Sequence, residues 1–309
     1  MVRNALKDGL LLEDKLGNNP FVMGFIGSTD THSAAPGSAE EDNYVGHLGR
    51  RDAQYNNVQD HFDSNPGGHA VVWAEENSRD SIFQAIRRTE TYATSGTRPI
   101  LRFFAGDLDA DLCETPDMIG RAYTQGVPMG GQLNASAGGA PPRFLVSAQK
   151  DSGTLTSPGT DLQRVQIIKG WVDDRGQTHE KVFDIAGATA NGAGVDPQTC
   201  ARVGRGMQQS CTLWQDPQFD AGEDAFYYVR VLENPTCRWS TLQCQAAGVN
   251  PFSEQCAQQA TAATATARDS GASGDVFGKC CRDPAQEAFY SPVIQERAWS
   301  SPIWYRAHQ

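Results

Sequence analysis

One short segment combines residue types that are suited to metal chemistry. Residues 21–27 read Phe-Val-Met-Gly-Phe-Ile-Gly, and Asp30 and His32 follow this apolar run closely. Such a run, bounded by turn residues, is typical of a buried parallel strand. In α/β folds, ligands bind at the carboxyl ends of the strands. A carboxylate and a neutral imidazole at that position predict two ligands for a Zn, Mn or Fe ion.

Asp30 and His32 form only half of a catalytic metal site, because such sites usually have at least three protein ligands. The competing interpretation is a simple turn, which aspartate also favours. In the metal interpretation, the ion lowers the pKa of a bound water. Asp30 is then also a candidate catalytic base that accepts a proton from this water.

Three further side chains are candidates for the same site. His47 lies in the long polar stretch of residues 33–70 and is a candidate catalytic group, weighed against an ordinary solvated histidine. Arg50 is a candidate for binding an anionic part of the substrate, because arginine pairs bidentately with phosphate. Glu75, after the apolar run 70–74, is a candidate substrate contact. Solvent-facing surface is the commoner use of both Arg50 and Glu75.

The composition excludes several classes of protein. The chain has 309 residues, 39% hydrophobic and 20% charged, which indicates a folded protein of about two domains. Its net charge of −11 argues against nucleic acid and against an anionic membrane as the main partner. No apolar run reaches the roughly 18 residues of a membrane span. A small-molecule or esterified substrate is therefore the expected partner, and no pattern indicates an oligomeric state.

The eight cysteines and the N-terminal residues indicate the cellular compartment of the protein. No pair has the Cys-x-x-Cys spacing of a zinc site, so disulfides are weighed above free buried thiols. Local spacing suggests pairs within 200–211 and 237–244, although the connectivity stays open. Residues 1–16 resemble an amphipathic helix and show no signal peptide. We therefore expect a periplasmic or extracellular protein whose leader is not part of this chain. The disulfide candidates are Cys200, Cys211, Cys237, Cys244, Cys256, Cys280 and Cys281.

The hydrophobic periodicity changes along the chain. Residues 78–88 have the apolar spacing of a helix, with Ser78 as its N-cap. After residue 98, short β-type runs separated by Gly, Pro, Asn and Ser predict a β-sandwich. The runs comprise residues 100–104, 143–148, 162–168, 181–185 and 225–232. The expected domains are residues 1–97, a sandwich at 98–235, a Cys-rich insert at 236–288 and a C-terminal strand or tail at 289–309.

Several motifs together resemble a known family. Residues 25–32, Phe-Ile-Gly-Ser-Thr-Asp-Thr-His, resemble the last metal motif of the polymerase and histidinol phosphatase (PHP) superfamily. Residues 91–96 read Thr-Tyr-Ala-Thr-Ser-Gly. This segment and the tail at residues 295–305 resemble a PHP-related bacterial family catalogued as domain of unknown function 3604. The resemblance covers nearly the whole chain except the insert around 245–288.

This resemblance implies an α/β plus all-β protein. Residues 1–97 are expected to form the C-terminal part of a distorted (β/α)7 PHP-type barrel, followed by the β-sandwich. It also implies a hydrolase that binds two or three divalent ions and cleaves phosphoester, ester, carbamate or sulfate bonds with an activated water. The family's His-x-His motif is absent, so only Asp30 and His32 carry over as ligands and the site is expected to be incomplete in this chain. The alternative is a non-catalytic β-sandwich that serves binding or scaffolding, with a remnant metal domain.

Overall fold

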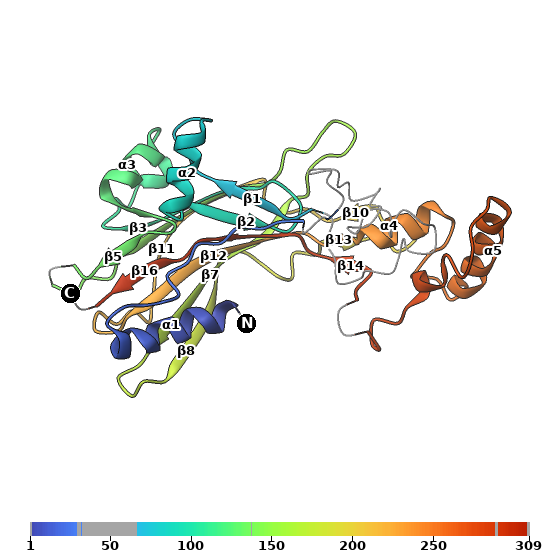
Figure 1. The fold of residues 1–309 in the computed structure, drawn as a ribbon. Helices are drawn as coiled ribbons and strands as arrows, with labels where there is room; N and C mark the ends of the chain where they lie inside the picture. Colours follow the sequence, from blue (N-terminus) through green and yellow to red (C-terminus); the bar gives the residue numbers. More distant parts are fainter. Residues whose placement is uncertain (1, 30–31, 33–66, 137, 288–289, 308–309) are drawn as a thin grey trace.

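Two β-sheets form the centre of the protein. The computed structural model describes residues 2–29, 32, 67–136, 138–287 and 290–307 (Figure 1). The larger sheet has eight strands in the order β1-β2-β15-β12-β16-β5, and β7 and β8 continue it beyond β12. Its strands are β1 (His69–Val72), β2 (Thr91–Thr94), β5 (Gln132–Asn134), β7 (Leu162–Val172), β8 (Thr178–Gly187), β12 (Ala225–Glu233), β15 (Arg297–Ser300) and β16 (Ile303–Arg306).

The smaller sheet has the order β11-β6-β3-β4. All neighbours within it are antiparallel, and in the larger sheet only β16 and β5 run parallel. The short β-type runs of the sequence all fall on strands, as predicted, and the sheets are mostly antiparallel. The strands of the smaller sheet are β3 (Ile100–Gly106), β4 (Gly126–Pro128), β6 (Arg143–Gln149) and β11 (Gln209–Gln215).

The two sheets pack face to face on one shared hydrophobic core. Alternate side chains of a strand point to the same face, so Phe103 and Phe144 of the smaller sheet meet Ile167 and Tyr227 of the larger one. The rings of Phe144 and Tyr227 have centroids 4.4 Å apart. Strands from both ends of the chain contribute to this core, which therefore crosses the boundaries expected near residues 97 and 235.

No closed barrel is found among the described residues, and the PHP-type barrel expected for residues 1–97 is unsupported. A (β/α) barrel requires parallel strands joined by helices. Here β1 and β2 flank a helix but pair antiparallel with each other, and β2 pairs antiparallel with β15. The segment before Asp30 is not a strand either: residues 22–29 are extended without ladder pairing. The first part of the chain thus extends the large sheet.

Three helices lie near the two sheets. α1 (Val2–Leu16) packs on the outer face of the large sheet, where Leu6 and Leu10 are buried against Phe226 and Trp304. α2 (Arg79–Arg87) connects β1 to β2, and the hydroxyl of Ser78 accepts a hydrogen bond from the Ser81 amide, which confirms the predicted N-cap. The third is α3 (Met118–Gln125). None of the helices in the described ranges combines the length and the apolar character that crossing a membrane requires.

A fully buried ion pair closes one end of the core. Lys169 of β7 places its Nζ 2.7 Å from Oδ2 of Asp216, and both side chains are inaccessible to solvent. The Tyr227 hydroxyl donates to the same oxygen at 2.9 Å, and Lys169 also donates to the Gln218 carbonyl. Such a pair persists in a core only when its hydrogen bonds are satisfied.

The Cys-rich insert projects from one end of the sheets (Figure 1). Its helices surround a small core that contains Cys244, Cys256 and Cys280. A short β-ribbon lies at its base. The remaining elements are η3 (Leu112–Glu114), β9 (Gly194–Val195), β10 (Arg202–Val203), β13 (Thr236–Cys237), α4 (Trp239–Ala246), α5 (Cys256–Asp269), η4 (Gly278–Cys281) and β14 (Val293–Ile294).

All eight cysteines form disulfides, which confirms the predicted oxidised state but corrects the pairing. The suggested local pairs 200–211 and 237–244 are both wrong. Cys113, which was not among the candidates, bonds Cys211 and ties η3 to β11. Sequence proximity misleads here because β-strands bring together cysteines that are far apart along the chain. The four bonds are Cys113–Cys211, Cys200–Cys237, Cys244–Cys280 and Cys256–Cys281.

Candidate functional site

The segment that leads to Asp30 and His32 is held against the large sheet by hydrogen bonds. The Phe25 amide donates to the Ser301 hydroxyl at 2.8 Å, and the Phe25 carbonyl accepts from the Thr91 hydroxyl at 2.9 Å. Further along, the Gly27 amide donates to the His69 carbonyl at 3.1 Å. These three bonds fix the backbone on both sides of residue 26 and give the following residues a defined starting point.

Two glycines allow this close approach. A Cβ atom on Gly27 would lie 2.6 Å from the Thr94 carbonyl oxygen and 2.7 Å from that of His69. A Cβ atom on Gly68 would lie 2.2 Å from the Ser28 carbonyl oxygen. Both contacts are with backbone, which cannot rotate away, so any larger side chain would push the segment off β1. Gly27 of the apolar run and Gly68 directly before β1 therefore allow the segment to contact the sheet.

The apolar run is only half covered, which corrects the prediction of a buried strand. Val22 is 39% and Ile26 63% exposed, whereas Met23 and Phe25 pack toward the outer core under α1. One side of the run rests on the sheet, and the described residues leave the other side open. An apolar run indicates burial of its residues but does not specify how many faces are covered.

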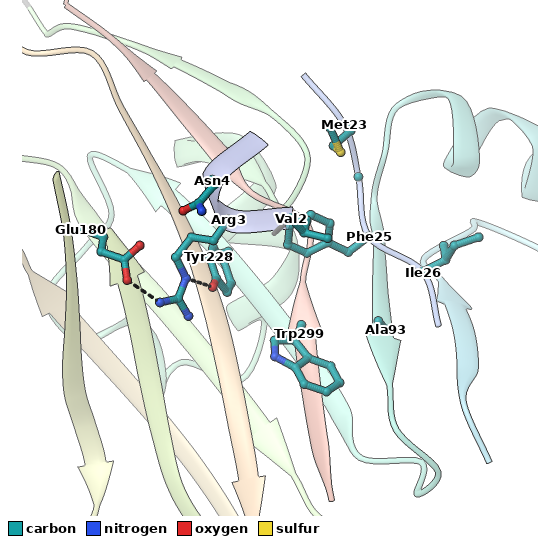
Figure 2. A pocket seen from close by; sticks show the side chains of 11 residues that line it. Val2, Arg3, Asn4, Met23, Phe25, Ile26, Ala93, Glu180, Tyr228 and Trp299 are labelled. Atoms are coloured by element: carbon teal, nitrogen blue, oxygen red, sulfur yellow. Dashed lines mark hydrogen bonds and ion pairs between the residues drawn. The ribbon is translucent and has the colours of Figure 1, made fainter. Parts of the chain in front are cut away.

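A groove lies between this run, α1 and the large sheet (Figure 2). Its volume is about 720 Å³, and its walls are mostly apolar. Phe25 and Tyr228 meet edge to face with ring centroids 5.7 Å apart. The other apolar walls are Val2, Met23, Ile26, Ala93 and Trp299.

At the polar end of the groove, the charged side chains bind one another. Arg3 donates to Tyr228 at 2.9 Å and to Glu180 at 2.8 Å, as the dashed lines of Figure 2 show. Lys7 lies 3.1 Å from the other oxygen of Glu180. Burial raises the pKa of Tyr228 against the opposing effect of Arg3, so the phenol acts as a neutral partner. The groove thus offers a mostly apolar surface whose one carboxylate, Glu180, is paired with Arg3 and Lys7.

The sequence-predicted site residues are only partly within the described chain. Asp30, His47 and Arg50 lie outside the described residues. His32 is described and exposed to solvent. Glu75 is exposed on the loop after β1, where its backbone amide donates to the Ser81 hydroxyl. This loop follows the last residue of β1. His69, whose carbonyl accepts the hydrogen bond from the Gly27 amide, is the first residue of β1.

The described residues do not by themselves fit a catalytic metal. Within them, no three His, Cys, Asp or Glu side chains gather closely enough to hold an ion. Of the two predicted ligands, only His32 is described, and one imidazole does not retain a catalytic ion. A metal centre with three protein ligands that uses His32 must draw at least one of them from outside these residues.

A second cavity was not predicted from the sequence, although it includes Glu75. Glu90 from just before β2, Arg102 from β3 and Tyr123 from α3 meet there. No local spacing connects these residues, so no motif could have found them. The nearest signal was Glu90 itself, a charged residue directly before a strand whose residues are all buried.

Comparison with known proteins identifies a family for most of the chain. Residues 1–268 match the model of a family described as "Protein of unknown function (DUF3604)". No curated protein and no solved structure matches the chain significantly. Nothing in these comparisons connects it to the PHP superfamily. The match covers well over half of the sequence, and the chain therefore belongs to the DUF3604 family.

Proposed function

We propose that this chain contributes Asp30 and His32 to the divalent-metal centre of a hydrolase. The observation that carries the proposal is the anchoring of residues 25–27 to Ser301, Thr91 and His69. An extended segment fixed in this way limits where the residues directly after it can lie. Precise placement is what metal ligands require, because coordination geometry tolerates small errors only.

The proposed centre takes its remaining ligands from outside the described residues. The side chains offered by Asp30 and His32 suit Zn, Mn or Fe, which accept both carboxylate and imidazole. Such an ion, when bound, supplies a water of lowered pKa for hydrolysis. The residues of this chain hold the ligand segment in place, and Asp30 is the group proposed to accept the proton of that water.

The proposed substrate is a small ester, with phosphoester, carboxylic ester, carbamate and sulfate as candidate bonds. His47 and Arg50 are proposed to contact it, although both lie outside the described residues. Four disulfides support action in an oxidising compartment, and we propose the periplasm or the extracellular space.

Metal analysis of the natively produced protein tests the proposal. We expect Zn, Mn or Fe to copurify and to activate hydrolysis of 4-nitrophenyl esters of phosphate, sulfate or acetate. Asp30→Ala and His32→Ala should lower metal occupancy and the rate at least about tenfold, as ligand loss does. His179→Ala is the matched control, because His179 bonds Asp173 on the far side of the large sheet. Unchanged metal content and rate in both ligand variants would refute the proposal.

A second candidate function is a binding or scaffolding module without catalysis. The groove of about 720 Å³ favours it, because mostly apolar concave surfaces of this size commonly hold ligands or partner segments. In that case the natively produced protein carries no stoichiometric metal, and Asp30→Ala leaves every measured property unchanged. The same metal analysis therefore separates the two candidates.

A further inference from the structure

The second cavity lies at the opposite end of β1 from His69. It joins the edges of the two sheets and has a volume of about 560 Å³, within the range of small-molecule sites. Its charged and aromatic walls come from β3, from α3, from the C-cap of α2 and from the residues that directly follow β1 or precede β2. They are Trp73, Glu75, Arg88, Glu90, Arg102 and Tyr123.

A buried carboxylate organises this cavity. Glu90 is only 2% exposed, and a carboxylate in that position is stable only when it is paired. Arg88 donates its Nε to one oxygen at 2.7 Å, and the Tyr123 hydroxyl donates to the other. Arg102 approaches that second oxygen to 3.8 Å. Glu90 therefore fixes three donor side chains in one place.

The two guanidinium groups are oriented by hydrogen bonds and keep unused donors. Arg88 Nη2 donates to the Trp73 carbonyl at 2.7 Å, and Arg102 Nη1 donates to Tyr123 at 3.1 Å. The Arg102 guanidinium lies over the Trp73 ring, 3.2 Å from its centroid, which sets its plane. Among the described residues, Nε and Nη2 of Arg102 and Nη1 of Arg88 have no acceptor. Fixed donors of this kind bind oxyanions well.

The charge balance of the walls predicts the charge of the ligand. In the inner part of the cavity, Arg88 and Arg102 carry two positive charges against the one negative charge of Glu90, and Glu75 at the rim adds a second negative charge. Glu75 is exposed at the rim, where water screens it. Trp73, Ala74 and Pro128 add apolar surface beside the donors. The ligand that complements the inner part of the cavity is a small apolar molecule with a single negative charge.

We propose that this cavity binds a small organic molecule through one carboxylate, which Arg88 and Arg102 grip while Trp73 and Pro128 contact its apolar part. Glu75 at the rim disfavours more highly charged anions. This proposal does not rest on the proposed metal centre.

Calorimetric titration of the whole protein with benzoate tests the proposal, and benzamide is the neutral isostere. We expect saturable benzoate binding in the millimolar range or tighter and at least tenfold weaker benzamide binding, because the charge-assisted bonds are lost. Inorganic phosphate should bind more weakly than benzoate, since it lacks the apolar part and meets Glu75. Equal binding of benzoate and benzamide, or no saturation by benzoate up to about 20 mM, overturns the proposal.

Three variants test whether benzoate binds in this cavity. Arg102→Gln should weaken benzoate binding about tenfold or more, because a half-buried charged donor is removed. Arg79→Gln, on the exposed face of α2 outside the cavity, is the matched control and should change nothing. Glu75→Gln should strengthen binding about two- to threefold by removing an exposed like charge. This gain cannot arise from misfolding, so an unchanged or weaker affinity in Glu75→Gln refutes the role assigned to the rim.

Discussion

At the scale of single residues, Gly27 allows the segment that leads to Asp30 and His32 to contact the large sheet. Its missing side chain leaves room for two carbonyl oxygens, from Thr94 and His69, that belong to neighbouring strands. The amide of the same residue donates to one of these carbonyls. A single atom added at this position would separate the segment from both strands at once, because neither backbone group can turn aside.

Gly27→Ala should therefore lower the free energy of unfolding by about 1–3 kcal/mol, the usual cost of overpacking. Its Cβ meets backbone oxygens at 2.6 and 2.7 Å, and the hydrogen bond to His69 must lengthen. Thermal or denaturant unfolding measures the loss, and proteolysis within residues 20–29 should become faster.

Gly194→Ala is the matched control, because a Cβ atom there would have no neighbour within 4 Å. We expect its stability to change little. Equal stability of the Gly27 variant and the wild-type chain would show that the segment is not pressed against β1.

At the scale of elements, α1 depends on a small set of contacts with the outer face of the large sheet. Leu6 and Leu10 supply its buried apolar surface. Arg3 and Lys7 both contact Glu180 of β8, which connects the helix to the edge of the sheet. Burial alone would raise the pKa of Glu180, but the hydrogen bonds from Arg3 and Lys7 outweigh it and lower this pKa below its ordinary value of 4.5.

This shift predicts that α1 loosens in acid. The unfolded chain keeps the ordinary pKa, so the folded state gains stability from Glu180 above about pH 4.5 and loses it as the pH falls through the lowered value. Hydrogen exchange of the α1 amides measured between about pH 6 and 3 should show this loss.

Glu180→Gln should reduce the pH dependence in that window and loosen α1 at neutral pH, while the second ion pair of the helix, between Glu13 and Arg306 of β16, stays in place. If the α1 amides of the wild-type chain are protected to the same degree at every pH in this range, the ion pairs do not hold the helix.

Local signals in the sequence predicted part of this architecture. The β-type runs identified β3, β6, β7, β8 and β12 but not β4, β5 and β11, and the hydroxyl of Ser78 identified the start of α2, because such signals are properties of neighbouring residues. The apolar run 21–27 misled, since its composition does not reveal that one face stays open. Cys113 and the cavity around Glu90 could not be predicted, because their partners come from distant parts of the chain.

At the scale of the whole molecule, disulfides divide the chain into two parts that are stabilised differently. The sheets have a large apolar core of their own. The insert has a small core in which cysteines are the main members, and Cys244–Cys280 and Cys256–Cys281 close loops of 36 and 25 residues. Each such bond contributes about 3 kcal/mol by restricting the unfolded chain.

Mild reduction should therefore unfold the insert before the sheets. We expect the helical circular dichroism of α4 and α5 to fall while near-ultraviolet signals of core aromatics such as Tyr227 persist. Thiol titration under denaturing conditions without reductant should detect no free cysteine. Detection of eight thiols, or simultaneous loss of both signals in a single transition, would contradict this division.

The place of β15 and β16 in the large sheet also determines when the protein can fold. Both strands pair with β12, and β15 fills the space between β12 and β2. The Arg297 amide bonds Ser95, which the ribosome makes 202 residues earlier. Until residues 297–306 emerge, the nascent chain carries β2 and β12 as open edges that invite wrong pairing. Correct folding of the sheet is thus a late event that follows synthesis of its central strands, and a chain shortened before residue 297 should aggregate.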